Sequence, residues 1–209
     1  GALDFPVYLC NDGSAACSAE LVFGTSDTPK DFLYFHIGHF AGGGLVLQNA
    51  LFTGHSGNAG ALGSMPVVMK NGKMGQLVDV ASLASLDDLL IEHGIDSDLI
   101  WDSPNNWHVP SALLERWIEE AAEGLSQVIS ASACLIDFEA VIIDGWLPEN
   151  LRSQLVARTV AVLAQNRPAG IAIPEVREGS LGGDAQSLGA VSLPLSNRFL
   201  VDRNDILKV

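Results

Sequence analysis

An alternation of helix-like and strand-like patterns in the second half of the chain constrains the fold most strongly. Residues 111–135 repeat apolar side chains every three or four positions, the period of a helix that packs on one face. The residues on that face are Leu114, Trp117, Ile118, Ala121, Leu125, Val128 and Ile129. An apolar strand at 140–145, a helix at 148–166 that starts with Pro148, and a strand at 170–176 are expected to follow. This alternation predicts a mostly parallel α/β sheet with flanking helices.

The first half predicts a hairpin ahead of that alternation. The expected elements are a strand at 5–10, a helix from Asn11 or Asp12 to Gly24, strands at 30–38 and 42–54 with a turn at Gln48–Asn49, a strand at 65–69 and a helix at 83–92. Ser111 is the candidate cap of the helix after them, and a small-residue helix at 182–199 ends the chain. A hairpin followed by helices fits a ribonuclease H-like lobe with a mixed sheet. The chain shows no repeat or internal linker, so we expect a single domain over residues 1–209.

Charge and hydropathy exclude several classes of function. The net charge is −14, and the eleven Lys and Arg residues are scattered, so a nucleic-acid surface on this chain is not expected. No run approaches the roughly 20 apolar residues of a membrane span, and the first ten residues lack the basic start of a signal peptide. We therefore expect a cytoplasmic protein that does not enter a membrane. The missing initiator Met leads us to expect a fragment of a longer protein.

The metal-binding residue types do not gather in the sequence. Cys10, Cys17 and Cys134 form no CxxC pair, so we expect reduced thiols and no metal site. His36 and His39 would point to opposite faces of a strand and would not share a metal. We expect no cofactor.

Two segments carry candidate site residues, each with a plain structural alternative. Asn11 and Asp12 lie between a strand and a helix, where α/β proteins place ligand groups, and a carboxylate there could act as a general base. The alternative is an ordinary helix cap. The glycines at 42–44 could cradle a phosphate through backbone N–H groups, or could simply form a tight hairpin. The small residues at 57–63 allow close approach of a ligand or of another element.

In their order and spacing, four segments of the sequence resemble those of the ROK family, which comprises repressors, uncharacterised open reading frames and sugar kinases. Asn11, Asp12, Ala15 and Ala16 match its Asn-Asp-x-x-Ala-Ala segment, and Ile37, Gly38, Gly42, Gly43 and Gly44 match its Ile-Gly-Thr-Gly-x-Gly-Gly-Gly turn. Residues 54–64 resemble its Gly-x-x-Gly-x-Ala-Gly-Glu-x-Gly-His segment, and residues 181–190 resemble its Leu-Gly-x-x-Ala-Gly-x-x-Gly-Ala segment. The resemblance covers nearly the whole chain and implies the C-terminal lobe of this fold.

The departures from the family pattern weaken the case for catalysis. The resemblance implies that Asp12 stands where the kinases have the base for the sugar hydroxyl. The Glu and His that hold sugar hydroxyls are Ala61 and Ser64 here, and the Thr-Gly that meets phosphate is His39-Phe40. The cysteine-rich zinc motif of the family is missing after the third segment, and the first ATPase lobe is not in this chain.

The resemblance therefore implies the sugar-sensing and dimerisation domain of a ROK-type transcriptional regulator without kinase activity. DNA would be bound only through a domain outside this chain, and the effector would be a sugar or a sugar phosphate. The expected ligand residues are Asn11, Asp12, Asn58 and Ser64, and the expected phosphate-turn remnant is Gly38, His39, Gly42, Gly43 and Gly44. The alternatives are the C-terminal lobe of an active ATP-dependent sugar kinase, in which Asp12 is catalytic, and an interaction domain that has lost ligand binding.

Overall fold

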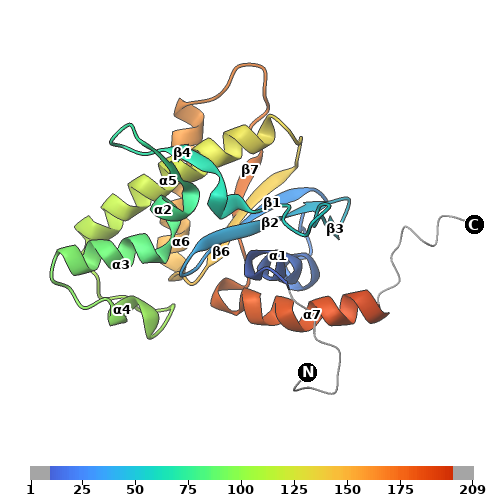
Figure 1. Cartoon of the computed structure of the whole chain (residues 1–209), viewed down its shortest axis with the longest axis horizontal. Coiled ribbons are helices and arrows are strands. Elements are labelled where there is room, and N and C mark those ends of the chain that lie inside the picture. Colours follow the sequence, from blue (N-terminus) through green and yellow to red (C-terminus); the bar gives the residue numbers. More distant parts are fainter. Residues whose placement is uncertain (1–9, 200–209) are drawn as a thin grey trace, which may run out of the picture.

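A mixed five-stranded sheet lies between two groups of helices (Figure 1). The computed structural model describes residues 10–199, with side chains as far as residue 193. The strand expected at 5–10 lies outside the described residues except for Cys10. The helices are α1 (Asp12–Phe23), α2 (Leu77–Ala81), α3 (Leu83–Glu92), α4 (Asp98–Trp101), α5 (Ser111–Ala133), α6 (Glu149–Gln165) and α7 (Ala185–Phe199). The strands are β1 (Phe32–Ile37), β2 (Ala41–Leu47), β3 (Ala50–Leu51), β4 (Pro66–Val68), β5 (Met74–Gln76), β6 (Ala140–Gly145) and β7 (Glu175–Glu178). Short 3₁₀ turns occupy 62–64 and 182–184.

The sheet has the strand order β3-β2-β1-β6-β7. β1 runs antiparallel to β2 and parallel to β6, and β6 runs parallel to β7. β1 is buried along its whole length because helices cover both faces of the sheet, which explains why its sequence is apolar except for His36. Side chains alternate between the faces: Leu33 and Phe35 belong to the larger core, and Phe32 and Tyr34 to the smaller one.

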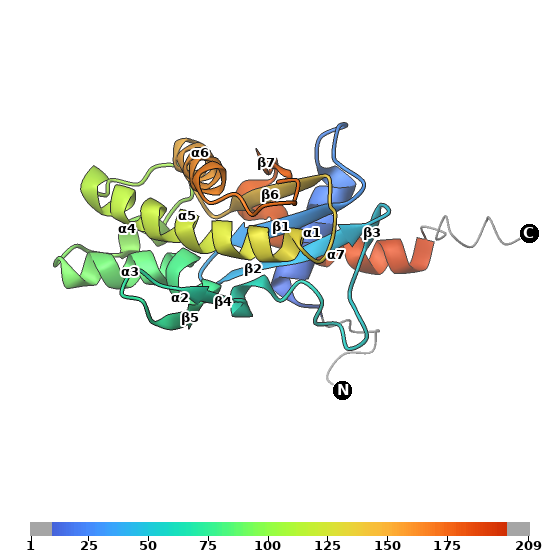
Figure 2. The same ribbon diagram turned by 90° about the horizontal axis from the view of Figure 1, so that it is seen from above.

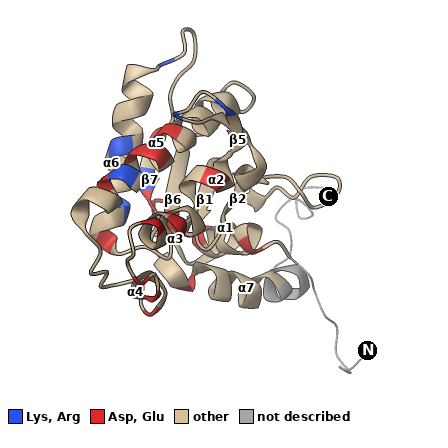
Figure 3. Cartoon of the chain, turned by 60° about the vertical axis from the view of Figure 1, so that its left-hand side comes forward, with Lys and Arg blue, Asp and Glu red and all other residues tan. Residues whose placement is uncertain are grey.

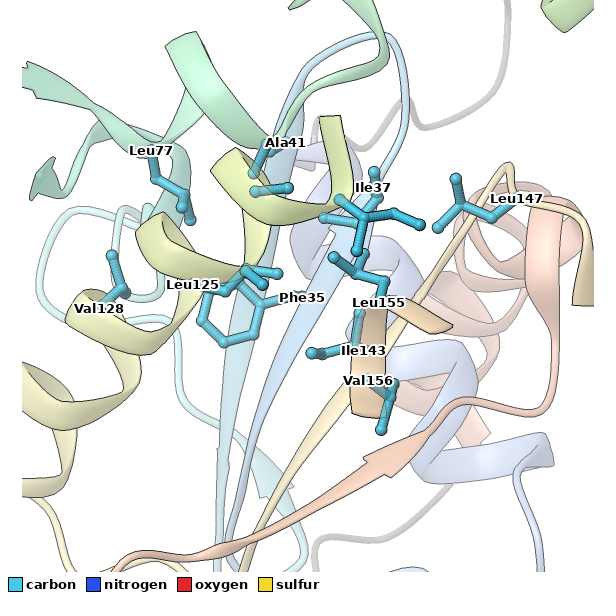
Figure 4. Packing of buried hydrophobic residues seen from close by; sticks show 14 of the residues in the cluster. Phe35, Ile37, Ala41, Leu77, Leu125, Val128, Ile143, Leu147, Leu155 and Val156 are labelled. Carbon is cyan, nitrogen blue, oxygen red and sulfur yellow. The ribbon is translucent and has the colours of Figure 1, made fainter. Parts of the chain in front are cut away.

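The larger core lies under α2, α3, α5 and α6 (Figure 4). Phe35 and Ile143 of the sheet meet Leu125 of α5 and Leu155 of α6, and all four side chains are fully buried. The predicted apolar face of α5 is confirmed, since Trp117, Ile118, Ala121, Leu125, Val128 and Ile129 are buried and Leu114 is partly buried against them.

The opposite face of the sheet is covered by α1 and α7, which lie side by side in Figures 1 and 2. Small side chains bring these helices close to each other and to the sheet. A Cβ at Gly189 of α7 would stand only 1.8 Å from the carbonyl oxygen of Ala15 in α1. The expectation of a small-faced helix after Asn11 is confirmed, because Ala15, Ala16 and Cys17 are all buried.

The hairpin that the sequence predicts is present as the antiparallel pair of β1 and β2. Gln48 and Asn49 both have positive φ angles, 55° and 59°, and they join β2 to β3 in the two-residue turn expected from their residue types. Gly24 ends α1, as predicted. The strand at 65–69 forms as β4, but it pairs with β5 in a separate two-stranded sheet around a turn at Gly72, whose φ is +77°.

Three local expectations are wrong. The predicted strand at 170–176 forms only from Glu175 onward, directly after Pro174, which has no N–H for a sheet ladder. Ser111 is the first helical residue of α5 and makes no cap, since Pro110 occupies the N-cap position. His39 lies beyond the end of β1 rather than on a strand. The short helices α2 and α4 were not predicted.

Candidate functional site

A pocket of about 310 Å³ opens where the start of α1, the start of β2 and the loop before β4 come together. The polar side chains of the lining include those of Asp12, His36 and Gln186. The full lining is Asn11, Asp12, Gly13, His36, Phe40, Ala41, Gly42, Gly43, Gly60, Ala61, Leu62, Gly63, Ser64, Val78 and Gln186.

Asn11 is the N-cap of α1. Its side-chain oxygen accepts hydrogen bonds from the backbone N–H of Gly13 at 3.0 Å and of Ser14 at 3.3 Å. These are two of the donors that a helix start leaves without partners. The capping interpretation is thus confirmed for Asn11, and its oxygen is occupied by the protein itself.

Asp12 presents its carboxylate at the mouth of the pocket. One oxygen accepts the Gly13 N–H at 2.8 Å, and the other accepts the side-chain N–H of Gln186, on α7, at 3.2 Å. Asp12 is exposed and has no ion pair among the described residues. Because a carboxylate has about four acceptor positions, it retains capacity for hydroxyl groups of a ligand.

The position of Gln186 depends on a buried network behind the pocket. Asp144, at the end of β6, is fully buried and accepts the N–H groups of Leu181 and Gly182 at 3.1 and 2.8 Å. Arg152 donates to the same carboxylate at 3.1 Å. These bonds fix the residues that lead into α7 and so set where Gln186 meets Asp12.

Glu20 anchors the same segment from α1. Its carboxylate accepts the backbone N–H of Ser180 at 3.2 Å and the Ser180 hydroxyl at 3.0 Å. Burial raises the pKa of Glu20, and the two Ser180 bonds act in the opposite direction.

His36 lies at the inner end of the pocket and is 3% exposed. Its Nδ1 is buried and has no hydrogen-bond partner among the described residues. Burial lowers the pKa of His36, while the nearby Asp144 and Asp12 carboxylates act in the opposite direction. A neutral imidazole at this position can donate or accept one hydrogen bond at each nitrogen, depending on its tautomer.

The turn between β1 and β2 is held by α3 and by Ser82. The carbonyl oxygens of Gly38 and His39 accept the first N–H groups of α3, from Leu83 at 3.0 Å and Ala84 at 3.1 Å. The hydroxyl of Ser82 accepts the Ala41 N–H at 2.7 Å. The carbonyl groups of Gly38 and His39 and the N–H of Ala41 are therefore bonded within the protein.

The glycines around the pocket allow backbones to meet closely. A Cβ at Gly43 would stand 2.1 Å from the carbonyl oxygen of Tyr34, and one at Gly13 would stand 2.4 Å from the Gly43 nitrogen. A Cβ at Gly60 would stand 2.7 Å from the Gly44 Cα, and Gly60 has a φ of +76°. These contacts join α1, β2 and the following loop, which is the close approach that the small-residue run predicts.

The structure brings together part of the predicted set of site residues. Asn11, Asp12, Ser64, Gly42 and Gly43 line the pocket. Gly38, His39 and Gly44 do not line it, and Asn58 is exposed on the loop, where its side chain bonds Ser56 at 3.3 Å.

Sequence reasoning did not single out three of the lining residues as ligand-contact candidates. They are His36, Phe40 and Gln186. A polar residue in the middle of the apolar strand 32–37 was a usable signal for His36. Gln186 had no local signal, since its partner Asp12 is 174 positions away.

Among the described residues, no three or more His, Cys, Asp or Glu side chains are grouped so that they could hold a metal ion. None of the described helices is long and apolar enough to cross a membrane.

The sequence matches the ROK family over residues 1–196. A relative in Sinorhizobium fredii, an uncharacterised protein, is 27% identical over 199 residues, which is 95% of this chain and 49% of that protein. The xylose repressor of Caldicellulosiruptor bescii is 30% identical over 130 residues, or 58% of this chain and 31% of the repressor. This chain thus spans half or less of the length of these two relatives.

The fold is also that of a solved ROK family glucokinase from Streptomyces griseus, crystallised with glucose and AMPPNP. The TM-score is 0.71 at 21% identity, with 92% of this chain and 69% of the glucokinase covered. N-acetylmannosamine kinases occur among the other relatives, and a ROK family transcriptional regulator occurs among the other solved structures. The comparisons support a sugar kinase-like fold and do not separate regulators from kinases.

Proposed function

This chain belongs to the ROK family, and we propose that it is the sugar-sensing effector and dimerisation domain of a transcriptional regulator without kinase activity. The observation that carries the proposal is the carboxylate of Asp12 at the mouth of a pocket, with acceptor capacity left for hydroxyl groups. Sugars are recognised through their hydroxyl groups, and hydrogen bonds to an ionised acceptor are among the stronger ones.

The turn at 38–41 supports sensing over phosphoryl transfer. Phosphoryl transfer depends on groups that position and neutralise the phosphate. In this turn the Ala41 N–H is bonded to Ser82, and Phe40 places an aromatic ring at the pocket. Ala61 and Ser64 line the same pocket where the family pattern has a Glu and a His, so fewer groups hold the sugar for reaction.

The rest of the proposal concerns the whole protein. We propose that residues 1–209 act as one domain, the C-terminal ROK lobe, of a cytoplasmic homodimer. DNA is bound by a domain outside this chain, in keeping with the net charge of −14 and the scattered basic residues. The similarity to a xylose repressor supports a regulator, because that relative is named as one.

A second candidate is the C-terminal lobe of an active sugar kinase. Asp12 favours it, because its carboxylate is exposed at the pocket and has no ion pair among the described residues. Kinases among the relatives favour it as well. In this reading Asp12 takes the proton of the sugar hydroxyl that attacks the phosphate.

Two measurements on the full-length protein separate these candidates. Calorimetry with glucose, xylose and N-acetylmannosamine should detect binding of at least one sugar. A coupled ADP-release assay with the same sugars and ATP should stay at background. Sugar-dependent turnover that is lost in Asp12→Asn would establish the kinase. If none of the sugars binds, the proposed sensing role is wrong, and an interaction domain without a ligand becomes the better description.

A further inference from the structure

We propose that the pocket takes an uncharged sugar, lying against the ring of Phe40, and rejects the phosphorylated form of the same sugar. This inference rests on the proposed function, in which the pocket binds a sugar, and it narrows the class of ligand. It follows from the charges, the backbone N–H groups and the aromatic side chain around the pocket.

The lining carries no positive charge to receive a phosphate. It includes neither Lys nor Arg, and its carboxylate is that of Asp12. His36 does not supply a cation at neutral pH, because burial lowers its pKa. Arg152, which lies behind the pocket, is bonded to Asp144 and Glu178. Figure 3 shows blue segments mainly on α6 and near β5, and none on α1. A phosphate would therefore meet the Asp12 carboxylate without a compensating charge.

The starts of the two helices near the pocket do not replace the missing cations. The start of a helix commonly binds anions through its free N–H groups. At α1 those groups are used, because Gly13 and Ser14 donate to the side chains of Asn11 and Asp12. At α3 they donate to the carbonyl oxygens of Gly38 and His39. Both helix starts thus have protein oxygens where a phosphate oxygen would bind.

Phe40 is an exposed aromatic ring with a second ring packed against it. It is 62% exposed and lines the pocket. The His39 ring packs edge-on against it, with centroids 4.5 Å apart. His39 also packs against Trp101 at 5.3 Å, and the Trp101 N–H donates to Asp87 at 3.2 Å. An exposed aromatic ring at the edge of a pocket is suited to contact the C–H face of a sugar ring.

The lack of a positive charge in the lining and the exposed Phe40 ring both fit an uncharged sugar. A sugar ring against Phe40 places hydroxyl groups along the pocket, where Asp12 accepts their hydrogen bonds and Gln186 offers a further polar group. The ligand then makes its polar contacts with the pocket through its own hydroxyl groups. Adding a phosphate adds about two negative charges at pH 7, and the described lining residues offer it no positively charged partner.

Calorimetry on the full-length protein tests whether the pocket rejects a phosphorylated sugar. The probes are glucose, xylose and N-acetylmannosamine, each beside the phosphate ester of its terminal hydroxyl. For any sugar that binds, the ester should bind at least about tenfold more weakly. An ester that binds as tightly as the free sugar, or more tightly, overturns the inference and leaves the sensing role standing. If none of the six compounds binds, the proposed function itself fails.

Variants at Phe40 test the aromatic contact. With the free sugar that binds, Phe40→Ala should weaken binding about three- to tenfold, and Phe40→Tyr should restore it. Phe52→Ala is the control, because Phe52 is also exposed, at 48%, and does not line the pocket. All three variants should keep the melting temperature without sugar. Binding by Phe40→Ala that equals the wild type would show that the ring does not contact the sugar.

Discussion

Replacing Gly43 by Ala should destabilise the protein, because this position has no room for a side chain. The added Cβ would stand 2.1 Å from the carbonyl oxygen of Tyr34 and 2.5 Å from Cδ1 of Leu62. Leu62 can shift, but the Tyr34 oxygen belongs to the backbone of β1, which is paired on both sides. The substitution must therefore separate β1 from β2 or move the loop that carries Leu62.

The expected loss in the free energy of unfolding is about 1–3 kcal/mol or more, the usual range for an overpacked core. In a chain of this size that corresponds to a fall of roughly 2–12 °C in the melting temperature. Gly42→Ala is the matched control. Its Cβ would meet only the Gly13 Cα, at 3.8 Å, which is an ordinary contact, and its φ is not positive.

Thermal and urea unfolding of the two variants, followed by circular dichroism, checks this prediction. Gly43→Ala should unfold well before the wild type, and Gly42→Ala should remain close to it. Equal melting temperatures for all three proteins would refute the claim that Gly43 is required for packing of the backbone. The glycine run would then be available for a ligand role.

Three further predictions concern charge, pH and the core. Asp12→Ala should weaken sugar binding in calorimetry by about 1.5–3 kcal/mol, or ten- to a hundredfold, while Glu149→Gln, at the exposed start of α6, should leave it unchanged. Burial lowers the pKa of His36, whereas a His in the unfolded chain gains a proton near pH 6.5, so the free energy of unfolding should fall as the pH drops from 7 to 5.5. Urea titrations of His36→Asn should show a smaller fall over the same pH range than those of the wild type. An equal fall in both proteins would contradict this prediction. Leu125→Ala should cost about 2–5 kcal/mol, whereas Leu135→Ala, 83% exposed, should cost less than about 0.5 kcal/mol in the same assay.

The parts of the fold that depend on local pattern could be predicted from the sequence. The helix period fixed the buried face of α5, and the two-residue turn at Gln48–Asn49 followed from residue types that accept positive φ. The wrong strand boundary before Glu175 shows the limit of pattern reading, because the apolar residues 171–173 precede Pro174, which has no N–H for a ladder, and the strand begins only after it.

The site depended more on contacts between distant residues. Asp12 and Asn11 could be selected because a strand-to-helix junction is visible in the sequence. Gln186 could not, since it reaches Asp12 only when α7 packs on α1 and the Asp144 network fixes the segment before it. The sequence shows only that Phe40 stands where the family pattern has a glycine, and its exposure and its packing on His39 are what indicate a surface for a sugar.

We propose that a sugar at Asp12 changes the affinity of the whole protein for DNA. A ligand acts as a signal only if it binds one conformation better than another. The direct measurement is fluorescence anisotropy of a DNA fragment, selected from a random-sequence pool by the full-length protein, with and without the sugar that binds in calorimetry. We predict that the sugar shifts the DNA affinity of the wild type, and that at the same concentration it has at most a small effect on Asp12→Ala. An identical shift in both proteins, or no shift in the wild type, would contradict the claim.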